Sequence, residues 1–471
     1  MFRRSILASP ARAALGVSAA LAALVAPGAV PTALANGRLP ATVSINFRQG
    51  HDSDIVAGLT FGLVFSHDGG ATWTWMCDDA IGIGNGPYDP QYVYAQSNAV
   101  FATTLAGLVV ARDRCTFAAT PEGKNFVSAN AVGPDGAYYY AASQTADTLH
   151  GTPADFKIYK STDDGATFPV AVNPANPADT NVYWSSLMVA PNNAQVVYVS
   201  GFRFVPDGSG GTKREHMVFR SDTGGTSWSA ALPLTGLTLA QNSQIRIVGI
   251  ASDAANHVYA RVDVIDNTTT DALYVSDNSG ASWTEIRRQP DRFIAFVARA
   301  ATNGQGKHDL IAVTTKFGPE ISHDDGASWA ALAGAPHIAC LSENAARELW
   351  ACTQDYDVGQ VAADGAGIMK TTDLATWTKV LRYEDLTEIS SCGADSVQQK
   401  TCSTLWCGYC VQLHCTPAAS YACPGPAEAP IIPPMTKGGC CDAGSAGGGP
   451  LALALSVATV LLRPRRRRDL P

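Results

Sequence analysis

The chain has 471 residues, of which 46% are hydrophobic and 16% charged, and its net charge at pH 7 is −8. This apolar content is ample for a buried core of several hundred residues. Stretches rich in Lys and Arg occur only near the two ends, so no basic face favours a nucleic-acid partner.

The first 35 residues have the three regions of a secretory signal peptide. Arg3 and Arg4 supply positive charge, residues 13–25 form an apolar stretch too short to span a bilayer, and a small-x-small cleavage site ends at Ala35. We expect residues 1–35 to be removed during export. An uncleaved N-terminal anchor is the alternative.

A turn-like motif, Ser-x-Asp-x-Gly-x-x-Trp, recurs seven times between residues 41 and 385, and we number these segments repeat turns 1 to 7. Turn 2, which ends at Phe117, has lost one residue, and turn 7, which ends at Trp377, has lost its Ser and Gly. The fuller turns contain Ser66, Asp68, Gly70 and Trp73; Ser161, Asp163, Gly165 and Phe168; Ser221, Gly225 and Trp228; Ser276, Asn278, Gly280 and Trp283; and Ser322, Asp324, Gly326 and Trp329. Their closing aromatic residues lie about 44 to 60 positions apart, a period typical of propeller blades.

Short apolar runs separate the repeat turns. Before turn 6, residues 294–298 and 310–314 form two such runs, residues 319–322 enter the turn, and the aromatic residue opens a fourth. Four short strands with turn signals between them make one antiparallel meander. We therefore predict an all-β fold, a seven-bladed β-propeller of four-stranded antiparallel blades over residues 41–385.

The residues of the repeat turns suit a structural role. Glycine adopts positive φ at little steric cost, and aspartate accepts hydrogen bonds from backbone N–H groups two residues further on. Tryptophan is large and apolar, so it should pack between neighbouring sheets. We interpret these aspartates as turn staples and not as catalysts or metal ligands.

The repeat turns resemble the Asp-box, or BNR, repeat of sialidases, sortilin-like receptors, xyloglucan hydrolases and photosystem assembly factors. The resemblance covers residues 41–381 and implies a β-propeller. It implies no single activity, because these families do unrelated work on the same fold.

Twelve cysteines in an exported chain predict disulfides. Cys340 and Cys352 lie on two predicted strands joined by a turn near Ala345, directly opposite each other, so we expect them to be bonded. Cys77 follows repeat turn 1 and Cys115 lies in turn 2. We pair these two across adjacent blades.

Six further cysteines follow the propeller, and residues 390–425 are predicted to form a small disulfide-stapled module. They are Cys392, Cys402, Cys407, Cys410, Cys415 and Cys423. A zinc site that uses Cys407, Cys410 and His414 is the alternative, and the oxidising compartment disfavours it. Residues 426–439 are rich in Pro and are expected to form a stiff spacer.

Residues 440–471 have the features of a C-terminal sorting signal. Cys440 and Cys441 precede a Gly/Ala-rich stretch, an apolar run at residues 451–462 and an arginine-rich end. This order is similar to the MYXO-CTERM tail of myxobacterial surface proteins, in which a cysteine is the processing or attachment point. We predict that the tail anchors the protein at the cell surface or outer membrane of a bacterium. A plain single-pass anchor is the alternative, although the run is shorter than the ~20 residues that a transmembrane helix needs.

No catalytic residue, metal site or cofactor is predicted. A sialidase needs three arginines around the substrate carboxylate, and only Arg246 and Arg292 lie near the starts of first strands. His308 and His337 are isolated in the sequence and are expected to be structural or exposed. Alternate acidic residues in loops are more readily solvated, or weak cation sites, than catalytic pairs; they are Asp52 and Asp54, Asp263 and Asp266, and Asp355 and Asp357.

The predicted function is therefore non-enzymatic: the propeller binds an unidentified protein or glycan ligand, touches the membrane only through its tail, and binds no nucleic acid. A sialidase-like glycoside hydrolase is the alternative. The longest connections between predicted strands, around residues 144–154, 206–214 and 264–270, are candidate binding loops. Tyr138-Tyr139-Tyr140 lies on a strand, and half of this run should face the core because strand neighbours alternate.

Overall fold

The computed structural model describes residues 39–83, 88–121, 125–149, 151–176, 179, 181–264, 270–300, 306–418, 421 and 423. The predicted signal peptide, the Pro-rich spacer and the tail with Cys440 and Cys441 lie outside the described residues. Among the residues that are described, no helix has the length and apolar character needed to cross a bilayer.

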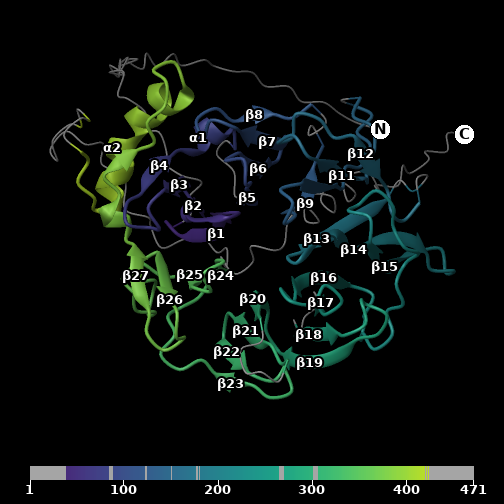
Figure 1. The fold of residues 1–471 in the computed structure, drawn as a ribbon. Helices are drawn as coiled ribbons and strands as arrows, with labels where there is room; N and C mark the ends of the chain where they lie inside the picture. Colours follow the sequence, from purple (N-terminus) through teal and green to yellow (C-terminus); the bar gives the residue numbers. More distant parts are fainter. Residues whose placement is uncertain are drawn as a thin grey trace, which may run out of the picture. The chain divides into compact units, whose positions relative to one another are not determined.

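Seven sheets follow one another around a ring, which confirms the seven-bladed β-propeller (Figure 1). The strands are β1 Thr42–Arg48, β2 His51–Leu59, β3 Gly62–Ser66 and β4 Thr74–Met76 in blade 1; β5 Tyr92–Tyr94, β6 Val100–Thr104, β7 Gly107–Ala111 and β8 Ala118–Ala119 in blade 2; β9 Val127–Val132, β10 Tyr138–Ala142, β11 Ile158–Ser161 and β12 Val170–Val172 in blade 3; β13 Val182–Ala190, β14 Asn193–Pro206 and β15 Thr212–Ser221 in blade 4; β16 Ser243–Ile250, β17 Val258–Val264, β18 Thr270–Ser276 and β19 Thr284–Gln289 in blade 5; β20 Phe293–Arg299, β21 Asp309–Thr314, β22 Gly318–Ser322 and β23 Ala330–Ala331 in blade 6; and β24 Cys340–Glu343, β25 Leu349–Cys352, β26 Ile368–Thr371 and β27 Thr378–Leu381 in blade 7.

Two blades depart from the four-stranded plan. In blade 4 the sheet has three strands, and the N–H groups of Ser229 and Leu232 donate to the carbonyls of Arg220 and Val218 where a fourth strand would pair. Blade 1 gains a fifth strand, β28 (Glu388–Ile389), which runs parallel to its outer strand β4.

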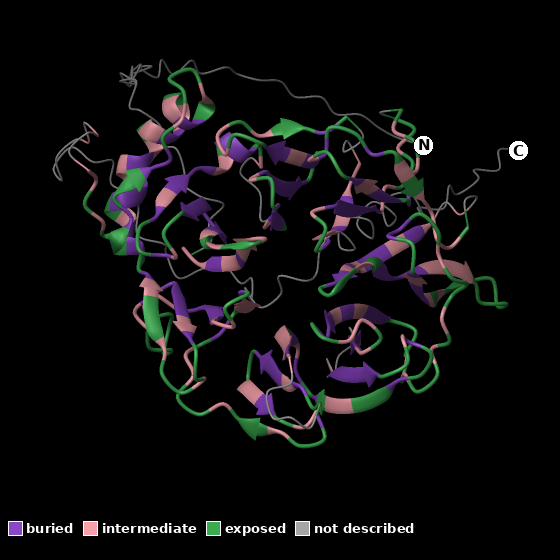
Figure 2. Ribbon diagram, viewed as in Figure 1, coloured by how far each residue is buried: buried purple, intermediate pink, exposed green. Residues whose placement is uncertain are grey.

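The middle strands of the blades are buried on both faces (Figure 2). Every residue of β6 and β10 is buried, because each sheet is covered on either side by a neighbouring blade. Tyr138, Tyr139 and Tyr140 are all at most 1% exposed. The expectation that only half of this tyrosine run would be core is therefore wrong.

The five fuller repeat turns share one hydrogen-bond pattern between the third and fourth strands. In turn 1, Ser66 Oγ accepts the N–H of Gly70 at 2.9 Å. Asp68 accepts from the N–H of Thr72 at 2.9 Å and from its hydroxyl at 2.6 Å. The aspartate thus staples the turn as expected, but it bonds the residue four positions on and not two.

The shortened turns keep the aspartate with a tighter geometry. Asp113 in turn 2 accepts from the N–H groups of Cys115 at 2.9 Å and Thr116 at 2.8 Å. These donors lie two and three positions on, because the turn has lost one residue. Asp373 makes the same pair of bonds in turn 7.

The repeat turns are also joints between consecutive blades. A Cβ added to Gly70 would lie 2.5 Å from Val380 and 3.0 Å from Trp350 of blade 7, and one added to Gly326 would lie 2.7 Å from Ile286 of blade 5. The indole N–H of Trp329 lies 2.9 Å from the carbonyl of Ile286. The expected packing of this aromatic residue between sheets is therefore confirmed.

We expect the turns to make the propeller sensitive to acid. Hydrogen bonds from Thr167 hold the pKa of Asp163 at about 2, and bonds from Ser328 hold that of Asp324 at about 2. An unfolded aspartate titrates near ~3.9, so this stabilisation is present above that pH and is lost as the pH falls towards 2. Melting temperatures measured between pH 5 and pH 2 should fall less steeply in an Asp163→Asn/Asp324→Asn variant than in wild type. Parallel slopes for the two proteins would contradict the assignment.

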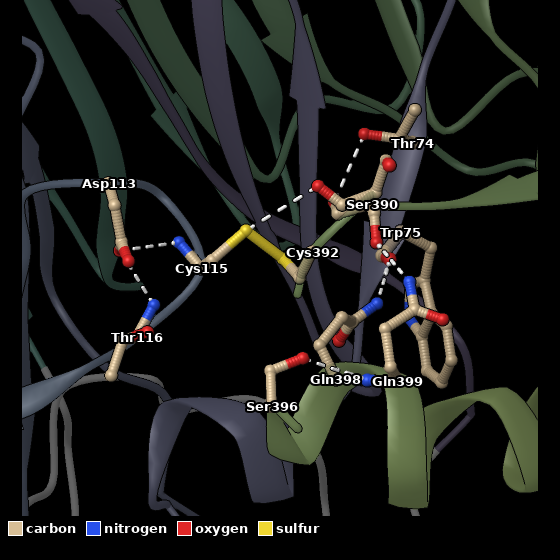
Figure 3. The surroundings of a disulfide bond; sticks show 11 residues. Thr74, Trp75, Asp113, Cys115, Thr116, Ser390, Cys392, Ser396, Gln398 and Gln399 are labelled. Carbon is tan, nitrogen blue, oxygen red and sulfur yellow. Dashed lines mark hydrogen bonds between the residues drawn. A yellow bond between two sulfur atoms is a disulfide. The ribbon is translucent and has the colours of Figure 1, made fainter. Parts of the chain in front are cut away.

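Residues 386–423, which we call the closing segment, run along the outer edge of blade 1. After the 3-10 turn η1 (Tyr383–Asp385), the segment forms β28, the π-helical stretch η2 (Gln398–Cys402) and helix α2 (Ser403–Leu413). The short helix α1 (Asp78–Ile81) of blade 1 lies beside η2. Three hydrogen bonds dock the segment: Thr74 Oγ1 to Ser390 Oγ at 3.1 Å, and the carbonyl of Trp75 to the N–H of Ser390 and to Gln398 Nε2, both at 2.8 Å (Figure 3).

Disulfides fasten the closing segment to two blades. Cys77 of blade 1 bonds Cys402, and Cys115 of blade 2 bonds Cys392 (Figure 3). The predicted Cys77–Cys115 bridge is therefore wrong, because each cysteine faces the returning chain and not the other blade. The segment thus spans from the end of blade 7 across blade 1 to blade 2.

The other described cysteines form three local bridges. Cys340–Cys352 joins directly opposite residues of β24 and β25, as predicted. Within the closing segment, the bridges are Cys407–Cys423 and Cys410–Cys415. Since all ten described cysteines are bonded, the structure favours the disulfide-stapled interpretation over a zinc site at Cys407 and Cys410.

Candidate loop-face binding site

The connections between second and third strands open on the face opposite the repeat turns, because antiparallel neighbours reverse direction at alternate ends. We call this surface the loop face. In the described part of the chain it comprises residues 60–61, 105–106, 143–149, 151–157, 207–211, 315–317 and 353–367.

Exposed apolar side chains lie on several separate connections of the loop face. Leu105, Leu149 and Phe317 lie at the tips of three connections and are 62%, 91% and 54% exposed, and Val358 and Val361 lie on the connection of blade 7. Leu39 and Ile294 are exposed near the starts of first strands, at the same end of their blades. Among the described residues, the other two exposed large apolar side chains, Val397 and Val411, belong to the closing segment. The repeat turns thus have no such residue within the described chain, and the asymmetry marks one face for contact.

Two of the three candidate binding loops extend from this face as hairpins. The connection of blade 3 is braced by bridges between Gln144 and Asp155 and between Asp147 and Thr152. In blade 4, β14 and β15 pair as far as Pro206 and Thr212. Residues 265–269 of the third candidate loop lie outside the described residues.

An aromatic cluster lies at the base of the blade 4 hairpin. Tyr183 stacks on Phe202 with ring centroids 5.4 Å apart, and Phe204 meets both rings edge-on. The guanidinium of Arg214 lies 4.3 Å from the Phe202 centroid. Tyr183 and Phe204 are half-buried. Partly exposed rings of this kind can stack against a sugar or an apolar peptide side chain.

Polar residues cross blade 5 beneath the loop face. Gln244, Asp263, Asp271 and Gln289 are consecutive cross-strand partners, and all four are buried. Arg261 lies two residues before Asp263 on β17 and donates from Nε to Asp271 at 2.7 Å. The carboxyl groups of Asp263 and Asp271 therefore lie side by side, and the Arg261 guanidinium pairs with both.

Burial shifts the pKa values of two groups in this cluster. It raises the pKa of the Asp271 carboxyl, and the neighbouring Asp263 adds to the effect while Arg261 opposes it. Burial also lowers the pKa of Arg246, where Arg261 and Arg292 act in the same direction and Asp263 opposes them. Arg246 and Arg261 are cross-strand partners on β16 and β17, and Arg261 is the arginine that sequence reasoning missed. Its position opposite Arg246 in the predicted meander could have indicated it.

Arg246 and Arg261 bond groups of the protein itself. Arg246 donates to the carbonyl of Ser185 at 2.8 Å and to Gln244 at 2.9 Å, and Arg261 is paired with Asp271. Asp271 is fully buried. In this conformation the cluster holds strands together and does not present three arginines to a ligand.

The other acidic residues singled out in the sequence also bond protein groups. Asp54 pairs with Arg48 at 2.8 Å. Asp52, Asp355 and Asp357 each accept a backbone N–H, from Ala346, Tyr383 and Ala363 respectively. Asp266 lies outside the described residues.

The two histidines singled out in the sequence have different surroundings. His337 is exposed and lies 3.1 Å from Asp364. His308 is buried between blades 5 and 6, where other titratable side chains surround it, so it is isolated in the sequence only.

No family model and no curated protein matches this chain. Among solved structures, a GH74 xyloglucanase from Xanthomonas campestris is 16% identical, with 70% of this chain and 57% of that chain covered and a TM-score of 0.31. The extracellular domain of a hybrid two component system from B. thetaiotaomicron is 13% identical over 66% of this chain and 36% of its own, with a TM-score of 0.44. YCF48 from Cyanidioschyzon merolae is 12% identical over 70% and 94%, with a TM-score of 0.42. This chain thus spans little more than half of the xyloglucanase and about a third of the second protein, and these similarities carry no argument about function.

Proposed function

We propose that this chain is an exported, non-enzymatic propeller that binds a protein or glycan ligand through its loop face. The observation that supports this most directly is the exposure of Leu105, Leu149 and Phe317 on connections of that face, opposite the repeat turns. Exposed apolar side chains are unfavourable in water, so their concentration on one face favours a contact surface. The hairpins of blades 3 and 4 extend from the same face.

Export and surface anchoring complete the proposal. The five disulfides are typical of proteins that fold in an oxidising compartment. The proposed signal peptide at residues 1–35 would deliver the chain there, and processing at Cys440 or Cys441 would hold it at the cell surface. Propeller, closing segment and spacer would then display the loop face to the surroundings.

Binding should be lost when the loop face is made acidic. The full chain would be screened against glycan and protein arrays, and each hit measured with Phe317→Glu and Leu149→Glu variants. Either substitution should weaken binding by tenfold or more, an effect of about 1.4 kcal/mol or greater, because a carboxylate replaces an apolar contact. Ala71→Glu, on an exposed residue of repeat turn 1, is the matched control and should bind like wild type.

Melting temperatures of all three variants should stay near that of wild type, since each residue is exposed. Equal affinity of the loop-face variants and wild type for every hit would place binding elsewhere.

Glycan hydrolysis is the second candidate, favoured by one observation. Asp263 and Asp271 are adjacent buried carboxyl groups, and the raised pKa of Asp271 is the property of a general acid. Both carboxyl groups are buried, so hydrolysis would also require that a substrate reach them. Release of sugar from sialosides or β-glucans by wild type, and its loss in Asp271→Asn, would establish the enzyme and replace the binding proposal.

A further inference from the structure

A compact cluster of metal-ligating side chains joins blades 5 and 6 on the face of the repeat turns, away from the loop face. His257 precedes β17, His308 precedes β21, and Asp325 lies in repeat turn 6. Their ligand atoms all lie within 4.8 Å of one another. His308 is 4% exposed, and the side chains of His257 and Asp325 are 12% and 11% exposed. Two imidazoles and a carboxylate therefore converge at a nearly buried point.

One nitrogen of each histidine faces the carboxylate. Nδ1 of His308 lies 2.8 Å from Asp325 Oδ1, and Nε2 of His257 lies 3.5 Å from the same oxygen. Ligands bound tetrahedrally to zinc at about 2.0–2.1 Å lie about 3.3 Å apart. The two separations from Asp325 Oδ1, 2.8 and 3.5 Å, lie on either side of this value, and all three ligand atoms lie within 4.8 Å of one another. An ion between the three groups would therefore require the side chains to adjust.

The second nitrogen of each histidine faces a separate carboxylate. His308 Nε2 lies 2.8 Å from Asp253, and His257 Nδ1 lies 2.6 Å from Asp277. In metal sites, ligating histidines commonly donate their other N–H to a carboxylate, which fixes the ring and directs the free nitrogen towards the metal. Both histidines of this cluster have that arrangement.

The carboxylate at position 325 is not required by the turn. The equivalent residue has positive φ in each fuller turn, and turns 1 and 4 place Gly69 and Gly224 there. Turn 3 has Asp164, whose carboxylate bonds a single hydroxyl of Ser97 at 2.5 Å. Turn 6 therefore carries, at a strained backbone position, an acidic residue that meets two histidines.

We propose that His257, His308 and Asp325 bind one zinc ion that joins blades 5 and 6. Imidazole nitrogen with a single carboxylate suits zinc, whereas calcium and magnesium prefer oxygen ligands. Three aspartates, at positions 253, 277 and 325, surround the point and favour a cation. The Tyr259 hydroxyl donates to Asp325 at 2.9 Å and helps to orient it.

Three features compete with the ion. The Tyr259 hydroxyl lies 2.8 Å from His257 Nε2, the nitrogen that would bind the metal. Lys307 Nζ lies 3.7 Å from Asp325 Oδ2 and offsets one negative charge. A protonated His308 that bridges Asp253 and Asp325 would also account for its two 2.8 Å contacts without a metal. The test must distinguish a bound ion from this imidazolium bridge.

The test is titration of the chelator-treated full chain with Zn²⁺, using protein that carries no polyhistidine tag. Wild type should bind one equivalent, with a melting temperature that rises on zinc addition, and Co²⁺ should give the visible absorption bands of a low-coordinate nitrogen–oxygen site. His257→Ala and His308→Ala should abolish the stoichiometric site. Asp253→Asn keeps all three ligands and should weaken affinity by about 10–100-fold.

His323→Ala is the matched control, because this residue lies in the same turn but is exposed and pairs with Asp309, at 2.9 Å, which is not one of the three proposed ligands. It should bind zinc like wild type. His257→Ala retains His308 and its two aspartates, so it tests the ion even if removal of the buried His308 unfolds the protein. Absence of a stoichiometric site in wild type, or equal zinc affinity in wild type and His257→Ala, would overturn the proposal and leave the imidazolium bridge.

Discussion

Replacing Trp406 with alanine should lower the free energy of unfolding by about 3–5 kcal/mol, the usual cost of removing a buried tryptophan. Trp406 lies on α2 of the closing segment and is fully buried. Its ring is 4.9 Å from that of Trp75 in blade 1, and Tyr409 from the next turn of the helix lies 5.1 Å from the same ring. The substitution would open a cavity between the propeller and the segment that closes it.

Chemical denaturation, with the disulfides intact, measures this effect. Val411→Ala is the matched control: it removes an apolar side chain from the same helix, but one that is 51% exposed, so it should change stability by less than about 0.5 kcal/mol. If both variants unfolded at the same denaturant concentration, α2 would contribute little to propeller stability and the disulfides alone would hold the segment in place.

The closing segment also shows where prediction from the sequence ended. The Cys340–Cys352 bridge could be predicted because it depends on one hairpin, in which the register of two strands fixes the pairing. Cys77 bonds a residue 325 positions away, and its partner is decided by where the chain returns after the seventh blade. No local sequence pattern indicates where the chain passes after the seventh blade.

The repeated turns were predictable for a similar reason. In turn 1, for example, the serine and the aspartate bond N–H groups within four residues, so the pattern depends on a short stretch of sequence alone. The complete burial of Tyr138, Tyr139 and Tyr140 was not, because alternation predicts one exposed face for an isolated sheet. In the ring, blades 2 and 4 cover both faces of blade 3.

The candidate sites were likewise predictable only where a local feature of the sequence marked them. Unusual loop length identified residues 144–154 and 206–214, and both extend from one face as hairpins. The exposed positions of Leu105 and Phe317 depend on turns too short to attract notice in the sequence. His257 and His308 are 51 residues apart, and they meet because equivalent turns of adjacent blades lie side by side.

Gly70→Ala should destabilise the propeller by about 2–5 kcal/mol, from the sum of backbone strain and overpacking. Gly70 has φ +90°, which an L-residue rarely adopts, and its new Cβ would lie 2.5 Å from Val380 and 3.0 Å from Trp350. Both neighbours belong to blade 7, so the clash falls on the contact where the last blade meets the first. Neither the φ nor the contact can be relieved by a rotation of the alanine methyl group.

Gly69→Ala separates the two contributions. Gly69 has φ +71°, but a Cβ added there meets nothing within 4 Å, so this variant should show only the strain, about 1–2 kcal/mol. The difference in unfolding free energy between the two variants then measures the packing of blade 1 against blade 7. Equal losses would mean that blade 7 moves aside at little cost, and that the ring is held closed by the disulfides and Trp406 of the closing segment and not by blade-to-blade packing.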